Sequence, residues 1–260
     1  MTSVPSFDTL TVDTEGAVGR LTLARPEKLN PLSWQCLAEI ATAARWFDTQ
    51  REIKAVIVSG SGRAFSAGAD LSTFSRRSEI STREVAEYGR KMADALEAMQ
   101  AIAIAEIQGW CVGGGLVLAA ACDLRIAADD AMFSIPEVDL GIPLAWGGIP
   151  RLVREIGPAL TKELVLTCRP FDTSEAKAAG FLNRVVPASE LSNETEQLAV
   201  SVAAKASHAI FSTKRHVNAV TDQMVGTMRS FADADGLVTA FNDAECADAR
   251  SAYLDARSKR

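Results

Sequence analysis

The sequence is poor in histidine and in unbroken apolar runs, and each shortage excludes a class of protein. The 260 residues include two histidines, His208 and His216, which lack the ligand spacing of a metal site. The longest apolar stretch, residues 112–122, has 11 residues with three glycines and is too short to span a membrane. The net charge is −6 and no basic block could follow a phosphate backbone, which argues against nucleic-acid binding.

Cysteine is also scarce and is not arranged for disulfide or metal chemistry. The five cysteines are scattered without C-x-x-C spacing, and three lie in apolar surroundings typical of reduced, buried thiols. Residues 1–19 contain no lysine or arginine, unlike secretory or mitochondrial leaders. We therefore expect a cytoplasmic protein. The 48% hydrophobic and 23% charged residues are typical of a globular protein with one large core or two modest domains.

Short apolar runs alternate with stretches of helical periodicity, which predicts an α/β fold with mainly parallel strands. The expected strands are a hairpin at 9–12 and 21–24, then 55–58, 102–107, 124–127 and 132–134. The expected helices are 32–47, 82–99 and 114–122, followed by helical segments that include 194–206 and 229–253. No strand is expected after about residue 189. We thus predict an α/β core over 1–190, which carries the functional site, and a helical C-terminal region over 191–260.

Two glycine-containing segments and one carboxylate are the main candidates for chemistry. Residues 65–70 (FSAGAD) and 113–115 (GGG) each follow an apolar run and precede an expected helix, so each can present free backbone N–H groups. Two such donors can converge on one carbonyl oxygen. Alone, the glycine run is equally compatible with a tight turn, and it lacks the G-x-G-x-x-G pattern of a dinucleotide loop. Glu137 is the candidate acid/base, or otherwise a solvated surface carboxylate.

The strings around these segments resemble the crotonase (enoyl-CoA hydratase/isomerase) superfamily. The resemblance covers about residues 8–257 and rests on residues 67–71, 108–116, 133–137 and 140–143. In addition, Arg25-Pro26 and Leu29-Asn30 are similar to the family's CoA-binding loop. It implies a spiral of repeated strand-strand-helix units. It also implies C-terminal helices that pack a homotrimer, often stacked into a homohexamer, and an acyl-CoA substrate with no separate cofactor or metal.

The resemblance assigns the oxyanion hole to the N–H groups of Ala69 and Gly114, which would hold a thioester enolate, and makes Glu137 the acid/base. Each such donor typically contributes ~3 kcal/mol. Family hydratases carry a second glutamate three residues after the oxyanion-hole glycine, and that position is Val117 here. A lone carboxylate can remove a proton and return it two atoms away, which favours isomerisation over hydration. Asp139 would share a face with Glu137 in an extended segment, or is otherwise a solvated charge.

The remaining alternative is a protein that binds acyl-CoA without turnover. Arg25 and Lys28 are the basic residues nearest the CoA-binding loop and would meet CoA phosphates, unless they are ordinary loop charges. Asp70 is either a substrate contact or a local turn former, and Trp110 and Trp146 either line the acyl pocket or belong to the core. Substrate contacts are expected at Arg25, Lys28, Leu29, Ala67, Asp70, Leu71, Trp110, Gly113, Pro136 and Trp146.

Overall fold

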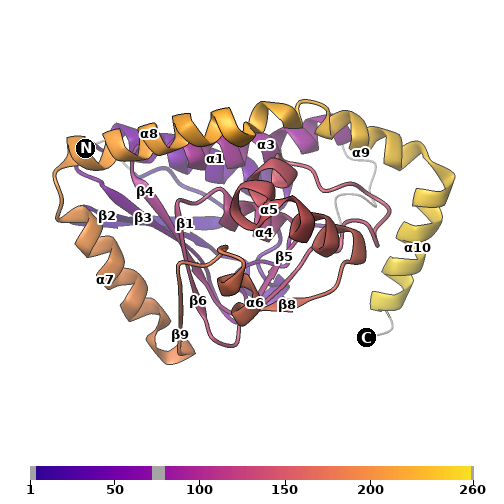
Figure 1. Cartoon of the computed structure of the whole chain (residues 1–260), viewed down its shortest axis with the longest axis horizontal. Coiled ribbons are helices and arrows are strands. Elements are labelled where there is room, and N and C mark those ends of the chain that lie inside the picture. The colour runs from indigo at the N-terminus through magenta and orange to yellow at the C-terminus, as the bar shows by residue number, and fades with distance from the viewer. Residues whose placement is uncertain (1–3, 72–79, 259–260) are drawn as a thin grey trace.

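A computed structural model describes residues 4–71 and 80–258, with two sheets at its centre (Figure 1). Over these residues the larger sheet has six strands in the order β1-β2-β3-β4-β6-β9. Its strands are β1 (Leu10–Glu15), β2 (Val18–Leu23), β3 (Ala55–Gly60), β4 (Ile102–Ile107), β6 (Leu124–Ala128) and β9 (Arg184–Val186). The smaller sheet has the order β5-β7-β8, from β5 (Trp110–Val112), β7 (Met132–Ser134) and β8 (Phe171–Asp172).

The strands of the larger sheet run parallel except for the β1–β2 hairpin, as the sequence predicted. Successive side chains of a strand point to opposite faces. On β3, Val56 and Val58 therefore enter the main core, whereas Ala55 and Ile57 enter a second, smaller core. A strand covered on both faces is expected to read as a continuous apolar run, which is how this segment reads.

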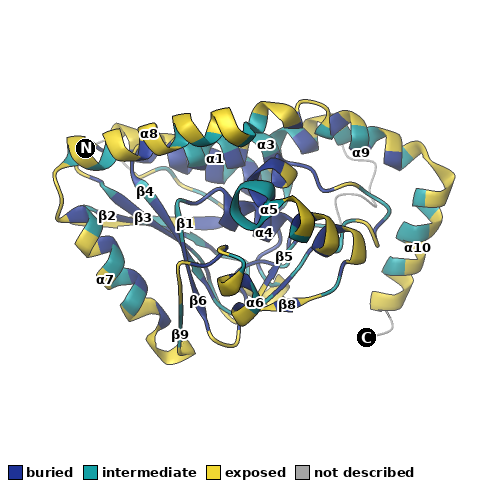
Figure 2. Ribbon diagram, viewed as in Figure 1, coloured by how far each residue is buried: buried dark blue, intermediate teal, exposed yellow. Residues whose placement is uncertain are grey.

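Helices cover both faces of the larger sheet. They are α1 (Trp34–Thr49), α3 (Thr82–Ala98), α4 (Gly114–Ala120), α5 (Gly148–Thr167), α6 (Thr173–Ala178), α7 (Leu191–Ala203), α8 (Ser207–Val225), α9 (Asp233–Asn242) and α10 (Ala244–Ser258). Short 3-10 turns lie at η1 (Pro26–Lys28), η2 (Ala188–Glu190) and η3 (Thr227–Ser230). Helices α1, α3 and α4 contribute to the main core, and α7 supplies Leu191, Ala199 and Ala203 to the second. Figure 2 shows the strands buried between these layers.

Local capping sets where the first two long helices begin. The Ser33 hydroxyl accepts a hydrogen bond from the Cys36 N–H at 3.2 Å, so α1 starts after Ser33. Ser81 and Glu84 form a reciprocal capping box at α3, which satisfies two otherwise unpaired backbone N–H groups. Both helices lie within about two residues of the ranges that apolar spacing predicted.

The C-terminal region is helical as expected, but it is more broken than the sequence suggested. The segment expected over 229–253 is divided into η3, α9 and α10. The break between α9 and α10 lies at Asp243, which has extended backbone and whose carboxylate accepts from the Cys246 N–H at 2.9 Å. The sequence reading did not identify α5, α6 or the short strands β5, β8 and β9, and it included α8 only as part of the helical C-terminal region. The helix expected directly after Asp70 falls largely outside the described residues.

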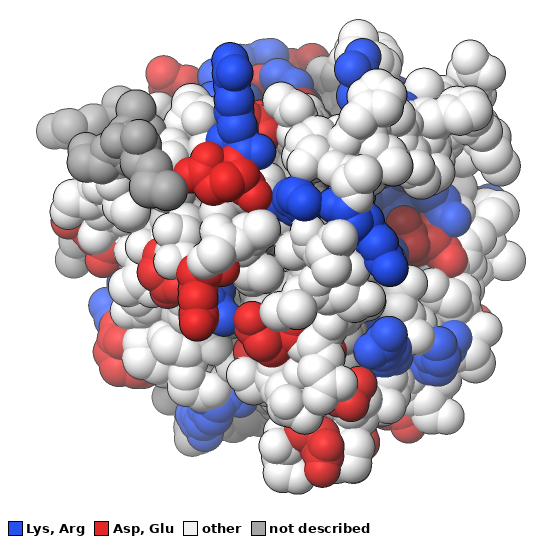
Figure 3. All heavy atoms as spheres, turned by 90° about the vertical axis from the view of Figure 1, so that its left-hand side faces the viewer, with Lys and Arg blue, Asp and Glu red and all other residues white. Residues whose placement is uncertain are grey.

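The surface and the helices are consistent with the composition. Within residues 4–71 and 80–258, no helix combines the length and apolarity that crossing a membrane requires. Basic and acidic side chains are interspersed among uncharged groups on the face shown in Figure 3, which gives that face no continuous basic track. The five cysteines are free thiols, and Cys36, Cys111, Cys122 and Cys168 are buried.

A buried ion pair fixes α8 to the sheet. The Lys214 ammonium, 4% exposed, donates to Asp123 Oδ2 at 2.7 Å and to the Ala101 carbonyl at 3.0 Å. Asp123 Oδ2 also accepts from the Ala103 N–H at 2.7 Å. A buried charge that loses its partner is left without either water or a counter-ion, so the pair is costly to break from one side.

We predict that Asp123→Ala lowers the free energy of unfolding by roughly 3–5 kcal/mol, because it strands the Lys214 ammonium in the protein. Urea denaturation measures the change. The matched control is Glu194→Ala, which breaks the more exposed Arg184–Glu194 pair at 3.3 Å and should cost less than about 1 kcal/mol. Equal losses for the two variants would contradict the assignment of Asp123 as a buried anchor.

Candidate active site

Two backbone segments that are distant in the sequence pair directly with each other at the site. Ser66 forms an isolated parallel bridge with Cys111. The Val112 N–H donates to the Ser66 carbonyl at 3.0 Å, and the Ser66 N–H donates to the Trp110 carbonyl at 3.1 Å. These bonds bring residues 66–70 alongside 110–115, so the two glycine-containing segments picked out from the sequence lie together.

The buried amide of Asn30 holds the first segment in place. Its Nδ2 donates to the Ser61 carbonyl at 2.8 Å and to the Ala64 carbonyl at 2.9 Å. The Asn30 carbonyl in turn accepts from the Ser66 hydroxyl at 2.8 Å. Asn30 has a φ of +53°, a conformation that asparagine tolerates better than most residues. The sequence reading named Asn30 only as part of a motif and did not identify this positioning role.

The close approach of the two segments depends on glycine at Gly68 and Gly113. Gly68 has a φ of +87°, and a Cβ there would lie 2.6 Å from the Val112 carbonyl oxygen and 3.4 Å from the Gly114 nitrogen. Gly113 has a φ of +51°, and a Cβ there would overlap Glu137 Oε1. Any side chain at either position would therefore separate the groups that the site brings together.

The N–H groups of Ala69 and Gly114 have no acceptor within the described part of the chain. Gly114 is the first residue of α4, where a helical N–H has no partner inside the helix. The residues on both sides of Ala69 are hydrogen-bonded to Leu32. The Gly68 carbonyl accepts from the Leu32 N–H, and the Asp70 N–H donates to the Leu32 carbonyl. Ala69 and Gly114 line one cavity, so both donors are positioned for an acceptor other than the protein.

Glu137 presents a buried carboxyl group to the same cavity. It lies in a turn after β7 that is closed by bonds from Leu140 to the Pro136 carbonyl and from Ile142 to the Glu137 carbonyl. The residue is partly covered, but its Oε2 is buried and has no hydrogen-bond partner. Burial raises the pKa of this carboxyl to about 7, and only its own backbone N–H opposes that shift. A carboxyl with this pKa can both accept and donate a proton near neutral pH.

Two cavities meet at this backbone. The inner cavity holds about 30 Å³ and is lined by Ala69, Gly114, Val117, Glu137, Ile142, Pro143, Leu144, Ala145, Trp146 and Leu237. The outer cavity holds about 650 Å³ and is lined by Leu29, Ala67, Trp110, Val112, Ser134, Pro136, Tyr253, Ala256 and Arg257. Neighbouring residues of the same three segments thus line different cavities, and the two residues with unpaired N–H groups line the inner one.

Several lining residues come from elements that the sequence reading did not connect to the site. Leu237 belongs to α9, and Tyr253 and Arg257 belong to α10. The Arg257 guanidinium donates to the Tyr253 hydroxyl at 2.8 Å, an i,i+4 pair that could have been noticed in the sequence. The helical C-terminal region therefore contributes to both cavities rather than standing apart from the core.

The other residues that the sequence suggested for the site differ in whether they are free to contact a substrate. Arg25 forms an ion pair with Asp70 at 3.4 Å, so each has a partner inside the protein. Lys28 is exposed on η1, and Leu71 lies partly buried at the edge of the described segment. Asp139 is exposed because its segment is a turn and not the extended chain that would pair it with Glu137. Within the described ranges, no three His, Cys, Asp or Glu side chains are grouped to hold a metal ion.

Comparisons with known proteins show which family the sequence resembles. The model of the enoyl-CoA hydratase/isomerase family matches residues 13–260. A probable enoyl-CoA hydratase of Mycobacterium bovis is 37% identical over 216 residues and 82% of each chain. A peroxisomal Δ(3,5)-Δ(2,4)-dienoyl-CoA isomerase of Arabidopsis thaliana is 35% identical over 227 residues, again 82% of each chain.

A solved structure extends the match to the fold. A crystal structure from Geobacillus kaustophilus described as an enoyl-CoA hydratase subunit is 33% identical, covers 96% of each chain and has a TM-score of 0.78. The similarity therefore includes the α/β sheets and the helical C-terminal region that contribute to the two cavities. Both the family model and these relatives span most of the sequence, and on that ground this chain belongs to the enoyl-CoA hydratase/isomerase family of the crotonase superfamily.

Proposed function

We propose that this protein isomerises enoyl-CoA thioesters, moving a double bond from the 3 to the 2 position through a thioester enolate. The observation that carries the proposal is the inner cavity, where the unpaired N–H groups of Ala69 and Gly114 and the carboxyl of Glu137 lie around one small space. A thioester carbonyl placed there would receive two hydrogen bonds. These would strengthen as negative charge develops on its oxygen.

The proton transfers follow from the position of Glu137. As a carboxylate it removes a proton from the α-carbon, and the electron pair of that C–H bond is delocalised onto the thioester oxygen as an enolate. When the carbonyl re-forms, this electron pair becomes the new double bond between the α- and β-carbons. The electrons of the old double bond then take the same proton back at the γ-carbon, so one carboxyl group serves as base and then as acid. Val117, fully buried, faces the same cavity and provides no second acid/base group. Hydration needs a group to activate water as well as one to protonate carbon, which favours isomerisation here.

The outer cavity is suited to the CoA portion of the substrate. In this proposal CoA is part of the substrate and not a separate cofactor. Its large volume and the apolar lining from Leu29, Trp110 and Pro136 suit an extended, flexible chain. Arg257 adds a positive charge at this cavity, where CoA phosphates would be attracted to a guanidinium. Arg25 is less available than the sequence suggested because Asp70 partly neutralises it.

We predict that Glu137→Gln lowers proton transfer by at least ~100-fold while leaving acyl-CoA affinity nearly unchanged, because it removes the base but keeps the shape of the site. Mass spectrometry of α-hydrogen exchange from deuterated water measures the first quantity, and calorimetry measures the second. Asp139→Asn, two residues away and exposed, is the matched control and should keep full activity.

The same assay separates the competing functions. A 3-enoyl-CoA and a 2-enoyl-CoA are offered in parallel, and faster conversion of the first supports isomerisation. Faster water addition to the second would show a hydratase, in keeping with the names of several relatives. Binding without any α-hydrogen exchange in the native protein would instead leave a non-catalytic acyl-CoA-binding protein. Full activity in Glu137→Gln would exclude Glu137 as the base.

We predict that kcat/KM rises with pH and levels off above about 7. The base must be deprotonated to act, and burial raises the pKa of Glu137 from 4.5 to about 7, so activity falls as pH drops below that value. A pH series with a 3-enoyl-CoA at concentrations well below KM gives the profile. An inflection near 4.5 would show that the carboxyl is not desolvated in the working enzyme.

We also propose that the protein assembles as a homotrimer or homohexamer through its C-terminal helices. Val217, Val220 and Met224 recur at spacings of three and four residues on α8, and Met228 and Phe231 follow after the extended Gly226. These five side chains are between 48% and 85% exposed. Figure 2 shows the outer side of α8 exposed along its length. An apolar stripe of this extent is typical of a surface that a partner covers.

We predict a mass three or six times that of one chain by light scattering at micromolar concentration. The double variant Met228→Glu and Phe231→Glu should shift the protein toward smaller species, because it places charges in the stripe. The control is Val4→Glu, at a residue that is 46% exposed and outside the C-terminal region. A native protein that is monomeric at this concentration would overturn the proposal.

A further inference from the structure

Trp146 has a backbone conformation that is unusual for a large side chain. Its φ is +61°, in the left-handed region that favours glycine, and the next residue, Gly147, has a φ of +69°. Bulky residues rarely adopt this conformation, and they keep it only where the surrounding structure holds them there. Such outliers concentrate at functional sites, so the position of the Trp146 ring is of interest.

The turn that contains Trp146 is held by buried polar groups. Arg151 Nη1 donates to the Trp146 carbonyl and to the Gly147 carbonyl, each at 3.3 Å. The Gly147 N–H donates to Asp233 Oδ2 at 2.8 Å, and the Gly148 N–H donates to the Ala145 carbonyl at 3.0 Å. Hydrogen bonds therefore hold the backbone on both sides of Trp146.

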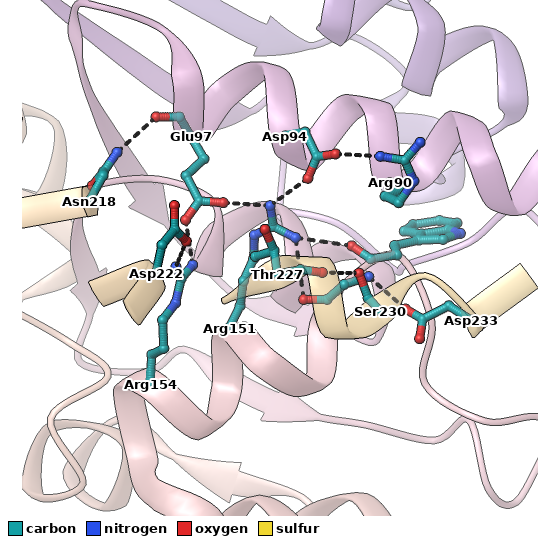
Figure 4. Close-up of polar contacts among 12 residues, drawn as sticks. Arg90, Asp94, Glu97, Arg151, Arg154, Asn218, Asp222, Thr227, Ser230 and Asp233 are labelled. Atoms are coloured by element: carbon teal, nitrogen blue, oxygen red, sulfur yellow. Dashed lines mark hydrogen bonds and ion pairs between the residues drawn. The ribbon is translucent and has the colours of Figure 1, made fainter. Parts of the chain in front are cut away.

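The arginine that holds this turn is itself anchored to α3. The Arg151 side chain is fully buried, and its Nη2 contacts Asp94 Oδ1 at 3.0 Å and Glu97 Oε2 at 2.6 Å. Figure 4 shows Arg151 between these two carboxylates, with Arg90 and Arg154 on the far side of Asp94 and Glu97. The guanidinium cannot shift without breaking two ion pairs in which its own side chain is fully buried.

The Trp146 ring lies against two glycines, one of them next to the proposed oxyanion hole. A Cβ at Gly89 of α3 or at Gly114 of α4 would overlap the ring. The ring is 7% exposed and lines the inner cavity together with Val117, Leu144 and Leu237. The space that remains beside Glu137 is about 30 Å³, which is enough for only a few small atoms.

We infer that Trp146 determines the chain-length specificity of the site and restricts it to short acyl groups. This inference rests on the proposed function, because it takes the inner cavity to hold the acyl chain. The ring contacts the backbone of Gly114, so an acyl chain whose carbonyl meets the Gly114 N–H finds the ring within a few carbon atoms. The held turn fixes the backbone of Trp146, and the two glycines let α3 and α4 pack directly against its ring. In an apolar pocket, one methylene that does not fit costs about 10- to 200-fold in kcat/KM.

The experiment compares kcat/KM for butenoyl-, hexenoyl-, octenoyl- and dodecenoyl-CoA in the native protein and in Trp146→Gly. Glycine suits the positive φ at this position, so the variant removes the ring while the turn is kept. We expect the native protein to prefer the two shorter substrates by at least ~10-fold, and Trp146→Gly to reduce or reverse that preference by at least ~10-fold. Calorimetry with saturated acyl-CoAs should show the same change in relative Kd.

Two further variants complete the design. Trp46→Phe alters a buried tryptophan of α1 that does not line the inner cavity, and it should leave the ratio between long and short substrates unchanged. Trp146→Phe keeps a smaller ring and should move the limit by one or two carbons, which serves as the test if Trp146→Gly does not fold.

The outcomes separate this inference from the proposed function. A native protein that uses dodecenoyl-CoA as well as butenoyl-CoA would overturn the inference and leave the proposed function intact. An unchanged ratio of kcat/KM between long and short substrates in both Trp146 variants would also overturn the inference and leave the proposed function intact. Absence of turnover and of binding at every chain length would contradict the proposed function, and the inference with it.

Discussion

The site depends on the close contact between two backbone segments, residues 66–70 and 110–115. The Ser66–Cys111 bridge and the hydrogen bonds beside it form only because Gly68 leaves no side chain between the Val112 carbonyl and the Gly114 nitrogen. The contact places two residues with unpaired N–H groups, Ala69 and Gly114, in the wall of the inner cavity. Fixed donors of this kind need not reorient when charge develops on a substrate oxygen, which is the usual basis of their catalytic effect.

The protein pairs several buried charges and leaves the Glu137 carboxyl oxygen Oε2 without a hydrogen bond. Asp123 meets Lys214, and Arg151 meets Asp94 and Glu97, so burial is offset by a partner in each case. Burying an ionised carboxylate without a counter-ion is unfavourable, and the raised pKa of Glu137 expresses that cost. The same desolvation that weakens the folded protein makes the carboxyl useful for proton transfer near neutral pH.

The sequence predicted the parts of the fold that rest on local patterns. The strand over 102–107 and the helices α1 and α3 were found because apolar spacing is a local property of the sequence. The strands β8 and β9 have two and three residues, too few to show a period, and their pairing with β7 and β6 is long-range. The division at Asp243 was missed because a single aspartate that caps a new helix does not interrupt an apolar pattern.

For the site, the sequence indicated which segments take part but did not reveal all of the contacts between them. Glu137, Gly113 and Trp146 were picked out and lie together. The Arg25–Asp70 pair and the exposure of Asp139 depend on how loops fold against each other, which no spacing rule gives. Leu237 and Tyr253 reach the cavities from the last two helices, more than 100 residues beyond the glycine motifs. Only the packing of those helices reveals them.

Membership of the family does not by itself decide the reaction, since relatives named as hydratases and as an isomerase are almost equally similar to this chain. The difference must come from side chains within a shared backbone. Val117 lies on α4 in the wall of the inner cavity, with Glu137 as the carboxyl in that wall. A second carboxylate there would repel the charged form of Glu137 and divide the titration between two groups. With valine in that position Glu137 titrates alone, which suits a reaction that moves one proton between two carbons of the same substrate.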